Sequence, residues 1–127
     1  MGGVHVAKKL MIIMVNTDPK NPAELGAPFF QATVAAAMDY EVEIILTAQS
    51  GELAIKGVAD KIQVQPGSTK TVYDFIKDAH EAGAIMKVCT PTLELWGNDL
   101  IPEISETVGG AYMISQAMDD DVVTFTY

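Results

Sequence analysis

Residues 74–93 read DFIKDAHEAGAIMKVCTPTL, and this stretch decides the fold class. Its first part has apolar residues at helical spacing, and Gly83 follows at the position that ends many helices. The apolar run 85–88 then predicts a strand buried on both faces, and Cys89 comes directly after it. Thr90-Pro91 predicts a second helix after the strand, with the threonine as its N-cap and the proline as its first residue.

Further apolar runs predict more strands of the same sheet, and the segments between them predict helices. Strands that alternate with helices form parallel, right-handed βαβ units. We therefore expect an α/β fold: an open, mostly parallel, flavodoxin-like sheet with helices on both faces, in a single domain over residues 1–127. The predicted strands are 10–15, 42–46, 85–88, 122–126 and a short one at 111–113; the predicted helices are 29–40 (opened by Pro28), 71–82 and 101–108 (opened by Pro102), with helical turns at 50–55, 57–62 and 115–118.

The composition excludes several classes of protein. The 127 residues hold 17 acidic and 8 basic side chains, a formal net charge of −9, so neither nucleic acid nor an anionic membrane surface is an expected partner. A hydrophobic share of 49% excludes a disordered chain. Residues 1–9 lack the apolar stretch of a signal peptide, and no early apolar run reaches the ~18 residues of a membrane helix. The expected location is therefore the cytoplasm.

In a parallel sheet of this kind, binding and catalytic residues gather beyond the carboxyl ends of the strands. The segments expected there are 16–22, 48–52 and 89–96, with Ser115 as a further candidate. The named candidates are Cys89 for catalysis, Thr90, Pro91 and Thr92 for a supporting helix N-terminus, and Asn16, Thr17 and Trp96 for the lining of a cleft.

Cys89 is the candidate nucleophile because it lies between a buried strand and a predicted helix N-terminus. Unpaired backbone N–H groups at such a terminus favour a thiolate, which is the competent nucleophile. The alternative is that Cys89 is one more small, buried apolar residue. As the only cysteine it allows no intrachain disulfide, no cysteine-rich zinc site and no resolving thiol. His5 and His80 are interpreted as solvated or capping residues, not as its base.

Other kinds of site fit the sequence poorly. Residues 16–19, Asn-Thr-Asp-Pro, stand where a flavin- or nucleotide-binding protein needs a loop rich in glycine and hydroxyl residues. Gly109-Gly110 is interpreted as a turn, and the three aspartates at 119–121 as a solvated turn, because adjacent acids do not converge on one cation. We therefore expect no cofactor and no metal.

Four segments together resemble the DsrE/DsrF-like family of sulfur-relay proteins, over nearly the whole chain. The most specific piece is EAGAIMKVC: a helix-ending glycine, a short apolar strand and then a cysteine, which matches the family's sulfur-accepting cysteine in position. The resemblance implies a cytoplasmic sulfurtransferase or sulfur carrier, in a homo-oligomer of three or six subunits, that exchanges sulfur with donor and carrier proteins. The segments are KKLMIIMVNTDP (8–19), FFQATVAAAMDYEVEIIL (29–46), DFIKDAHEAGAIMKVCTPTL (74–93) and VGGAYMISQAMDDDVVTF (108–125).

Three hypotheses compete on this basis. The first is a sulfur carrier that holds sulfane sulfur on Cys89 as a persulfide or thiosulfonate, which a partner protein must resolve because the chain has no second cysteine. The second is a non-catalytic assembly subunit of a sulfur-relay complex. The third is a small-ligand-binding, flavodoxin-like module. For the expected self-association, Met113, Met118 and Trp96 are candidate interface residues, since methionine and aromatic residues are enriched at interfaces.

Overall fold

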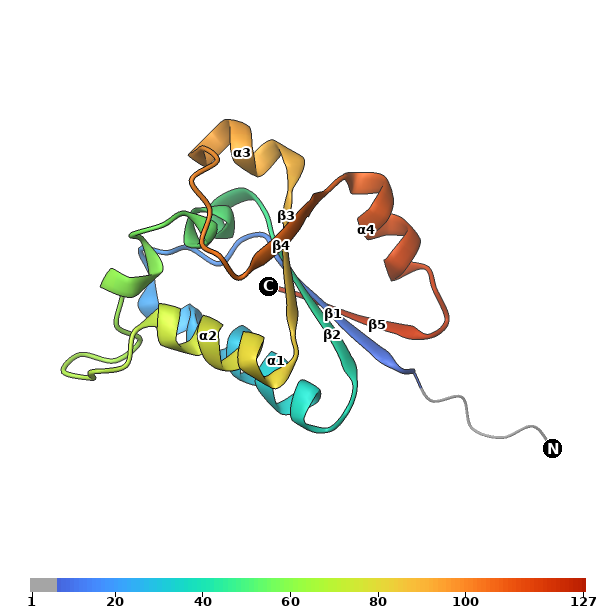
Figure 1. Ribbon diagram of the computed structural model, residues 1–127, viewed down its shortest axis with the longest axis horizontal. Coiled ribbons are helices and arrows are strands. Elements are labelled where there is room, and N and C mark those ends of the chain that lie inside the picture. Colours follow the sequence, from blue (N-terminus) through green and yellow to red (C-terminus); the bar gives the residue numbers. More distant parts are fainter. Residues whose placement is uncertain (1–6) are drawn as a thin grey trace.

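Five strands form the centre of the protein in the computed structural model, which describes residues 7–127 (Figure 1). The expectations about a signal peptide and about His5 rest on residues 1–6, which lie outside the described part. In chain order the elements are β1 (Lys9–Met14), the 3₁₀ segment η1 (Pro22–Glu24), α1 (Gly26–Ala37), β2 (Glu41–Leu46), the 3₁₀ segments η2 (Ala48–Ala54) and η3 (Ala59–Lys61), α2 (Val72–Ala82), β3 (Ile85–Cys89), α3 (Thr90–Trp96), β4 (Ile104–Val108), α4 (Gly110–Ala117) and β5 (Val122–Thr126).

The strands lie in the order β4-β3-β2-β1-β5, and every neighbouring pair is parallel. From β1 to β4 the chain moves across the sheet in one direction, and it then returns through α4 to add β5 on the other side of β1. The sheet is therefore open, with β4 and β5 as its edge strands among the described residues. The expected α/β class is confirmed.

Helices cover both faces of the sheet (Figure 1). On one face, α1 and α2 pack on a large core that includes Phe29 and Ile76 from the helices and Ile44 from β2. On the other face, α4 covers a smaller cluster around Met11 and Ile45. Because side chains alternate along a strand, β1 and β2 contribute to both cores, which explains their near-continuous apolar runs.

Local sequence explains the best-defined helix, α2. Thr71 is its N-cap and forms a reciprocal capping box with Asp74, whose backbone N–H donates to the threonine hydroxyl. Gly83 ends the helix in the left-handed region, with φ of 116°. The predicted helix 71–82 is therefore confirmed with Gly83 at its end, and Thr71 is its N-cap instead of its first residue.

Three sequence predictions about local structure are wrong. Residues 101–108 contain the strand β4 instead of a helix, because this segment pairs with β3 and Pro102 lies in the loop before it. Residues 111–113 belong to α4 instead of a short strand, and Gly109 is the N-cap of that helix. Cys89, not Thr90, is the N-cap of α3.

The structure contains no helix, within residues 7–127, that has the length and apolar character needed to cross a membrane.

Candidate functional site

The candidate site lies where the chain leaves β3 and β4 in two different directions (Figure 1). After β3 the chain enters α3, whose Leu93 packs against the core beneath α1 and α2. After β4 it enters α4 on the opposite face of the sheet. In α/β proteins, ligands bind beyond the carboxyl ends of neighbouring parallel strands whose connections diverge in this way, and we call this place the crevice.

Cys89 is the last residue of β3 and lies at this crevice. Its Cα partner across the sheet is Val108, the last residue of β4. The side chain is unpaired and 6% exposed, so it is nearly enclosed. As N-cap of α3, Cys89 has extended backbone, but its side chain makes no capping hydrogen bond to the first turn of the helix. The sulfur is therefore free of hydrogen bonds from that turn.

Two helices begin beside Cys89. One is α3, which follows it directly, and the other is α4, whose N-cap Gly109 follows Val108. A helix N-terminus carries partial positive charge and unpaired N–H groups. A Cβ atom built on Gly109 or Gly110 would meet nothing within 4 Å, so the start of α4 borders open space. The two termini thus border the end of β3, next to open space.

The three residues predicted to support Cys89 have different roles. The Thr90 hydroxyl donates to the carbonyl oxygen of Val108 at 3.2 Å and so ties the start of α3 to the end of β4. Pro91 lies in the first turn of α3, where it supplies no N–H donor. Thr92 is fully buried, and its hydroxyl lies 3.4 Å from the carbonyl oxygen of Leu46. Thr90 and Thr92 therefore anchor α3 to the two strands on either side of β3.

Trp96 fastens the far end of α3 to η2. Its indole N–H donates to the carbonyl oxygen of Ala48 at 2.8 Å. The backbone of Gly51 lies so close to α3 that a Cβ there would approach Trp96 Cδ1 to 3.2 Å and overlap Thr92. The contacts of Trp96 are thus those of a packing residue between α3 and η2.

Asn16 and Thr17 line a different hollow. It has a volume of about 360 Å³, lies at the carboxyl end of β1 and is shared with Tyr127 and Pro28; Cys89 is not among its lining residues. Ser115 is exposed on α4, where its hydroxyl donates to the carbonyl oxygen of Tyr112. His80 is exposed in the last turn of α2. The structure therefore brings Cys89, Thr90 and Val108 together and places Asn16 and Thr17 elsewhere.

A cluster of charged side chains lies between the sheet and α4, and sequence reasoning missed it. Lys9, Glu43 and Lys87 come from β1, β2 and β3, and Glu43 and Lys87 are 6% and 7% exposed. Lys9 pairs with Glu43, and Lys87 Nζ lies 3.2 Å from Glu43 Oε1. Lys87 also pairs with Glu106 of β4 at 2.9 Å. A signal was present: each of the three inner strands carries a charged residue among apolar ones, and Lys9, Glu43 and Lys87 share a face.

Tyr112 of α4 completes this cluster. Its hydroxyl donates to Glu43 Oε1 at 2.7 Å and accepts from Lys87 Nζ at 3.0 Å. The ring lies 4.5 Å from Lys87 Nζ, within the range of a cation–π contact. Lys9 Nζ donates to Gln116 Oε1 of the same helix at 2.6 Å. The charged cluster therefore holds α4 in place, and with it the helix N-terminus beside Cys89.

The two buried charges of the cluster stabilise each other. Burial raises the pKa of Glu43, but hydrogen bonds from Lys9, Tyr112 and Lys87 outweigh it and hold the pKa below its usual value of 4.5. Burial lowers the pKa of Lys87, but hydrogen bonds with Tyr112, Glu106 and Glu43 outweigh it and raise the pKa above its usual 10.5. Both groups are therefore charged at neutral pH.

This arrangement suits a reaction at sulfur. Cys89 is a soft nucleophile at the end of a rigid strand, in a crevice bordered by two helix N-termini that favour negative charge. Within residues 7–127, neither His80 nor another imidazole lies in this crevice to act as a base.

Comparison with solved structures shows the same architecture in another protein. The crystal structure of the YchN protein from E. coli matches with a TM-score of 0.72 and 14% sequence identity, over 94% of this chain and 99% of that chain. At this identity the likeness establishes the fold and not the activity. No protein-family model matches the chain, and no curated protein matches it at significant sequence similarity.

Proposed function

We propose that this protein is a cytoplasmic sulfur carrier that holds sulfane sulfur on Cys89 and passes it to a partner protein. The observation that carries the proposal is the position of Cys89 at the crevice where α3 and α4 diverge. The sequence resemblance to the DsrE/DsrF-like sulfur-relay family supports it, and so does a fold shared with YchN over most of both chains.

The reaction is an exchange of thiolates without net oxidation. The Cys89 thiolate attacks the outer sulfur of a donor persulfide, a new S–S bond forms, and the donor thiolate leaves with the electron pair of the broken S–S bond. The thiolate of an acceptor protein then attacks the outer sulfur on Cys89 and displaces the Cys89 thiolate. Backbone N–H groups at the start of α3 and α4 favour the anionic persulfide between the two steps.

The expected partners are sulfur-donor and sulfur-carrier proteins with a basic docking face. The chain carries a formal net charge of −9, so complementary charge accelerates the encounter with such a partner. The transfer rate to that partner therefore falls as salt is added, whereas uptake from a small neutral donor does not.

Intact-protein mass spectrometry tests the proposal. The protein is incubated with polysulfide or tetrathionate, and the wild type gains a sulfur adduct that a reducing thiol removes. Cys89→Ser keeps nearly the same volume and removes the only thiol, so its mass stays unchanged while its fold persists. An unchanged wild-type mass with every donor, or an adduct on the Cys89→Ser variant, would contradict the proposal.

A second candidate is a non-catalytic assembly subunit of a sulfur-relay complex. The observation that favours it is the 6% exposure of Cys89, since an enclosed cysteine often serves only as a small apolar residue. Under this alternative the wild type takes up no sulfur but still binds the sulfur-relay proteins, and Cys89→Ser binds them equally well. A pull-down with both variants separates the two functions.

A further inference from the structure

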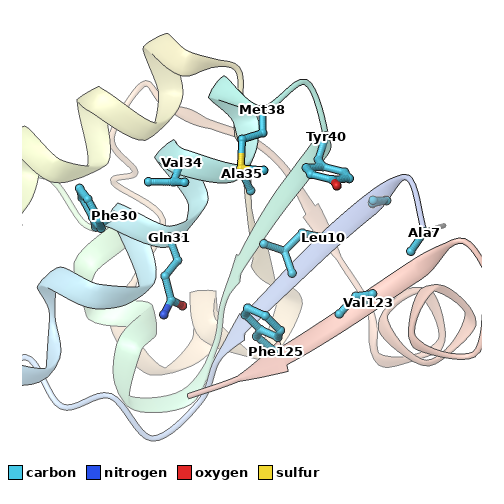
Figure 2. Close-up of a pocket in the computed structure, with 11 residues that line it drawn as sticks. Ala7, Leu10, Phe30, Gln31, Val34, Ala35, Met38, Tyr40, Val123 and Phe125 are labelled. Carbon is cyan, nitrogen blue, oxygen red and sulfur yellow. The ribbon is translucent and has the colours of Figure 1, made fainter.

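An apolar groove of about 520 Å³ runs between α1 and the edge of the sheet formed by β1 and β5 (Figure 2). Figure 2 shows side chains from the helix and from the strands facing one another across it. Lys9 is the one charged residue among those described as lining the groove, and its ammonium group is held by Glu43 and Gln116. The groove thus presents an apolar wall with little free charge.

The apolar residues of this groove are unusually exposed for a folded chain. Ten large apolar side chains are exposed within residues 7–127, and six of them line the groove. Their exposed fractions lie between 40% and 61%. The six are Phe30, Val34, Met38, Tyr40, Val123 and Phe125.

The area of these side chains is enough for a specific interface. Large apolar and aromatic side chains have ~150–250 Å² each, so six that are about half exposed present on the order of 500 Å² per copy. Two copies that cover this surface on each other bury about 1,000 Å² from these side chains alone, which reaches the range of specific protein–protein contacts. A small-molecule site would instead need several polar groups that converge on the ligand. At this groove, the Gln31 amide oxygen already accepts a hydrogen bond from the Tyr127 hydroxyl.

The edge of β5 determines how a second copy can bind. Asp121 and Tyr127 make backbone hydrogen bonds to β1, so by the two-residue alternation Val123 and Phe125 also face β1. The N–H and C=O groups of Thr124 therefore point away from β1, toward the open edge. The strand VVTFT has high β-propensity and none of the charges, prolines or bulges that protect natural edge strands.

We propose that this surface joins two copies of the chain, with β5 of one copy antiparallel to β5 of the other across a two-fold axis at Thr124. Two copies that pair through the same edge must be antiparallel, and the contact closes upon itself. Thr124 then exchanges two backbone hydrogen bonds with its counterpart, and the two sheets become continuous. The grooves of both copies meet over the paired strands.

One further feature agrees with this axis. Antiparallel pairing also places the acidic turn at 119–121 of each copy at opposite ends of the interface. That separation, about six residues or ~20 Å, exceeds the Debye length at physiological salt, so the two acidic turns repel little.

A cysteine at the axis tests the geometry directly. Thr124→Cys is combined with Cys89→Ser, so that the chain holds one thiol. The double variant is then treated with a mild oxidant. Facing residues of a hydrogen-bonded antiparallel pair lie about 5.5 Å apart at Cα, which suits a disulfide. The expected product is a covalent dimer. Ile114→Cys in the same background is the control, because Ile114 is exposed on α4 and not on the edge of β5, and it should stay monomeric on a denaturing gel.

A charge in the groove tests the energetics. Phe30 is exposed in a single copy, so the Phe30→Lys variant should fold. In sedimentation experiments it should weaken the association of two copies at least about tenfold. Ile114→Lys, equally exposed on α4, should leave the association unchanged. A wild type that sediments as a monomer at micromolar concentration would overturn the proposal. So would an oligomer that neither forms the Thr124→Cys disulfide nor responds to Phe30→Lys.

Discussion

The hydroxyl of Tyr112 in α4 donates to the carboxylate of Glu43 in β2, with 2.7 Å between the hydroxyl oxygen and Glu43 Oε1. The two residues are 69 positions apart in the sequence, and Glu43 lies beneath the helix in the middle of the sheet. The same hydroxyl accepts from Lys87, so it links a buried anion to a buried cation. Because α4 is only eight residues long, this contact is a large part of what orients it.

Tyr112→Phe should destabilise the protein by about 1.5–3 kcal/mol, the usual contribution of a hydrogen bond to a charged group. The ring remains, so its packing and its contact with Lys87 are kept. Urea unfolding measures the loss. Tyr73→Phe is the matched control: that hydroxyl donates to Glu103 at 2.9 Å, on the less buried side of the protein, and its removal should cost less. Equal losses would show that the charged cluster does not orient α4.

Stability should fall on acidification below pH 4.5, because the pKa of Glu43 in the folded state lies below its ordinary 4.5. Burial raises this pKa, but the hydrogen bonds from Lys9, Tyr112 and Lys87 outweigh it. The unfolded chain therefore takes up the proton first. The stabilisation is fully present above the unfolded pKa and is lost as pH falls through the lower, folded pKa.

Glu43→Gln isolates this effect in unfolding measurements over a range of pH. At neutral pH the variant should be less stable by about 3 kcal/mol, since Lys9 and Lys87 lose their shared carboxylate. Protonated glutamate resembles glutamine, so the difference between the two proteins should narrow as pH falls below 4.5. A difference that stays constant from neutral to acid pH would assign the acid sensitivity to other carboxylates.

Four strands could be predicted from the sequence. β1, β2 and β3 are largely buried, and β5 is exposed but consists of β-branched and aromatic residues. The inner strands are mostly apolar, and Gly83 ends α2 at the expected place. β4 could not be predicted in the same way. It is a five-residue edge strand with three exposed residues, so its alternation is weak, and Pro102 before it imitates a helix start. Its identity as a strand depends on pairing with β3, which is a tertiary interaction.

The candidate site was predictable only in part, for a similar reason. Cys89 follows a recognisable strand, and the rule about carboxyl ends points to it. The neighbour that completes the crevice is Val108, and it comes from the strand that was missed. The charged cluster depends on the register of three strands: Lys9 lies opposite Glu41, and Glu43 lies opposite Ile85. A sequence pattern does not set that register.

Gly51→Ala should destabilise the protein by about 1–3 kcal/mol, the usual cost of overpacking. A Cβ at this position overlaps Thr92 Cγ2 and lies 3.2 Å from Trp96 Cδ1, so α3 must move away from η2. Thermal or urea unfolding measures the loss. Gly110→Ala is the control, since a Cβ there meets nothing within 4 Å, and it should be neutral or slightly stabilising. If both alanines were tolerated equally, α3 would not be fixed against η2 by close packing.

Pro91→Ala should accelerate sulfur uptake by Cys89 about two- to fivefold. This factor corresponds to about 0.3–1 kcal/mol, the free energy by which a helix N-terminus favours a nearby negative charge. Pro91 lies in the first turn of α3, and alanine adds there the N–H donor that proline lacks. The extra donor favours the Cys89 thiolate and its anionic persulfide. The rate is followed by mass spectrometry at a fixed donor concentration. Pro102→Ala, in the loop before β4, is the control and should leave the rate unchanged. Thr90→Ala removes the hydrogen bond to Val108 but no backbone donor. It should therefore cost about 1 kcal/mol of stability and leave the rate of sulfur uptake by Cys89 unchanged. If Pro91→Ala took up sulfur no faster than the wild type, the N-terminus of α3 would have no part in holding the sulfur anion.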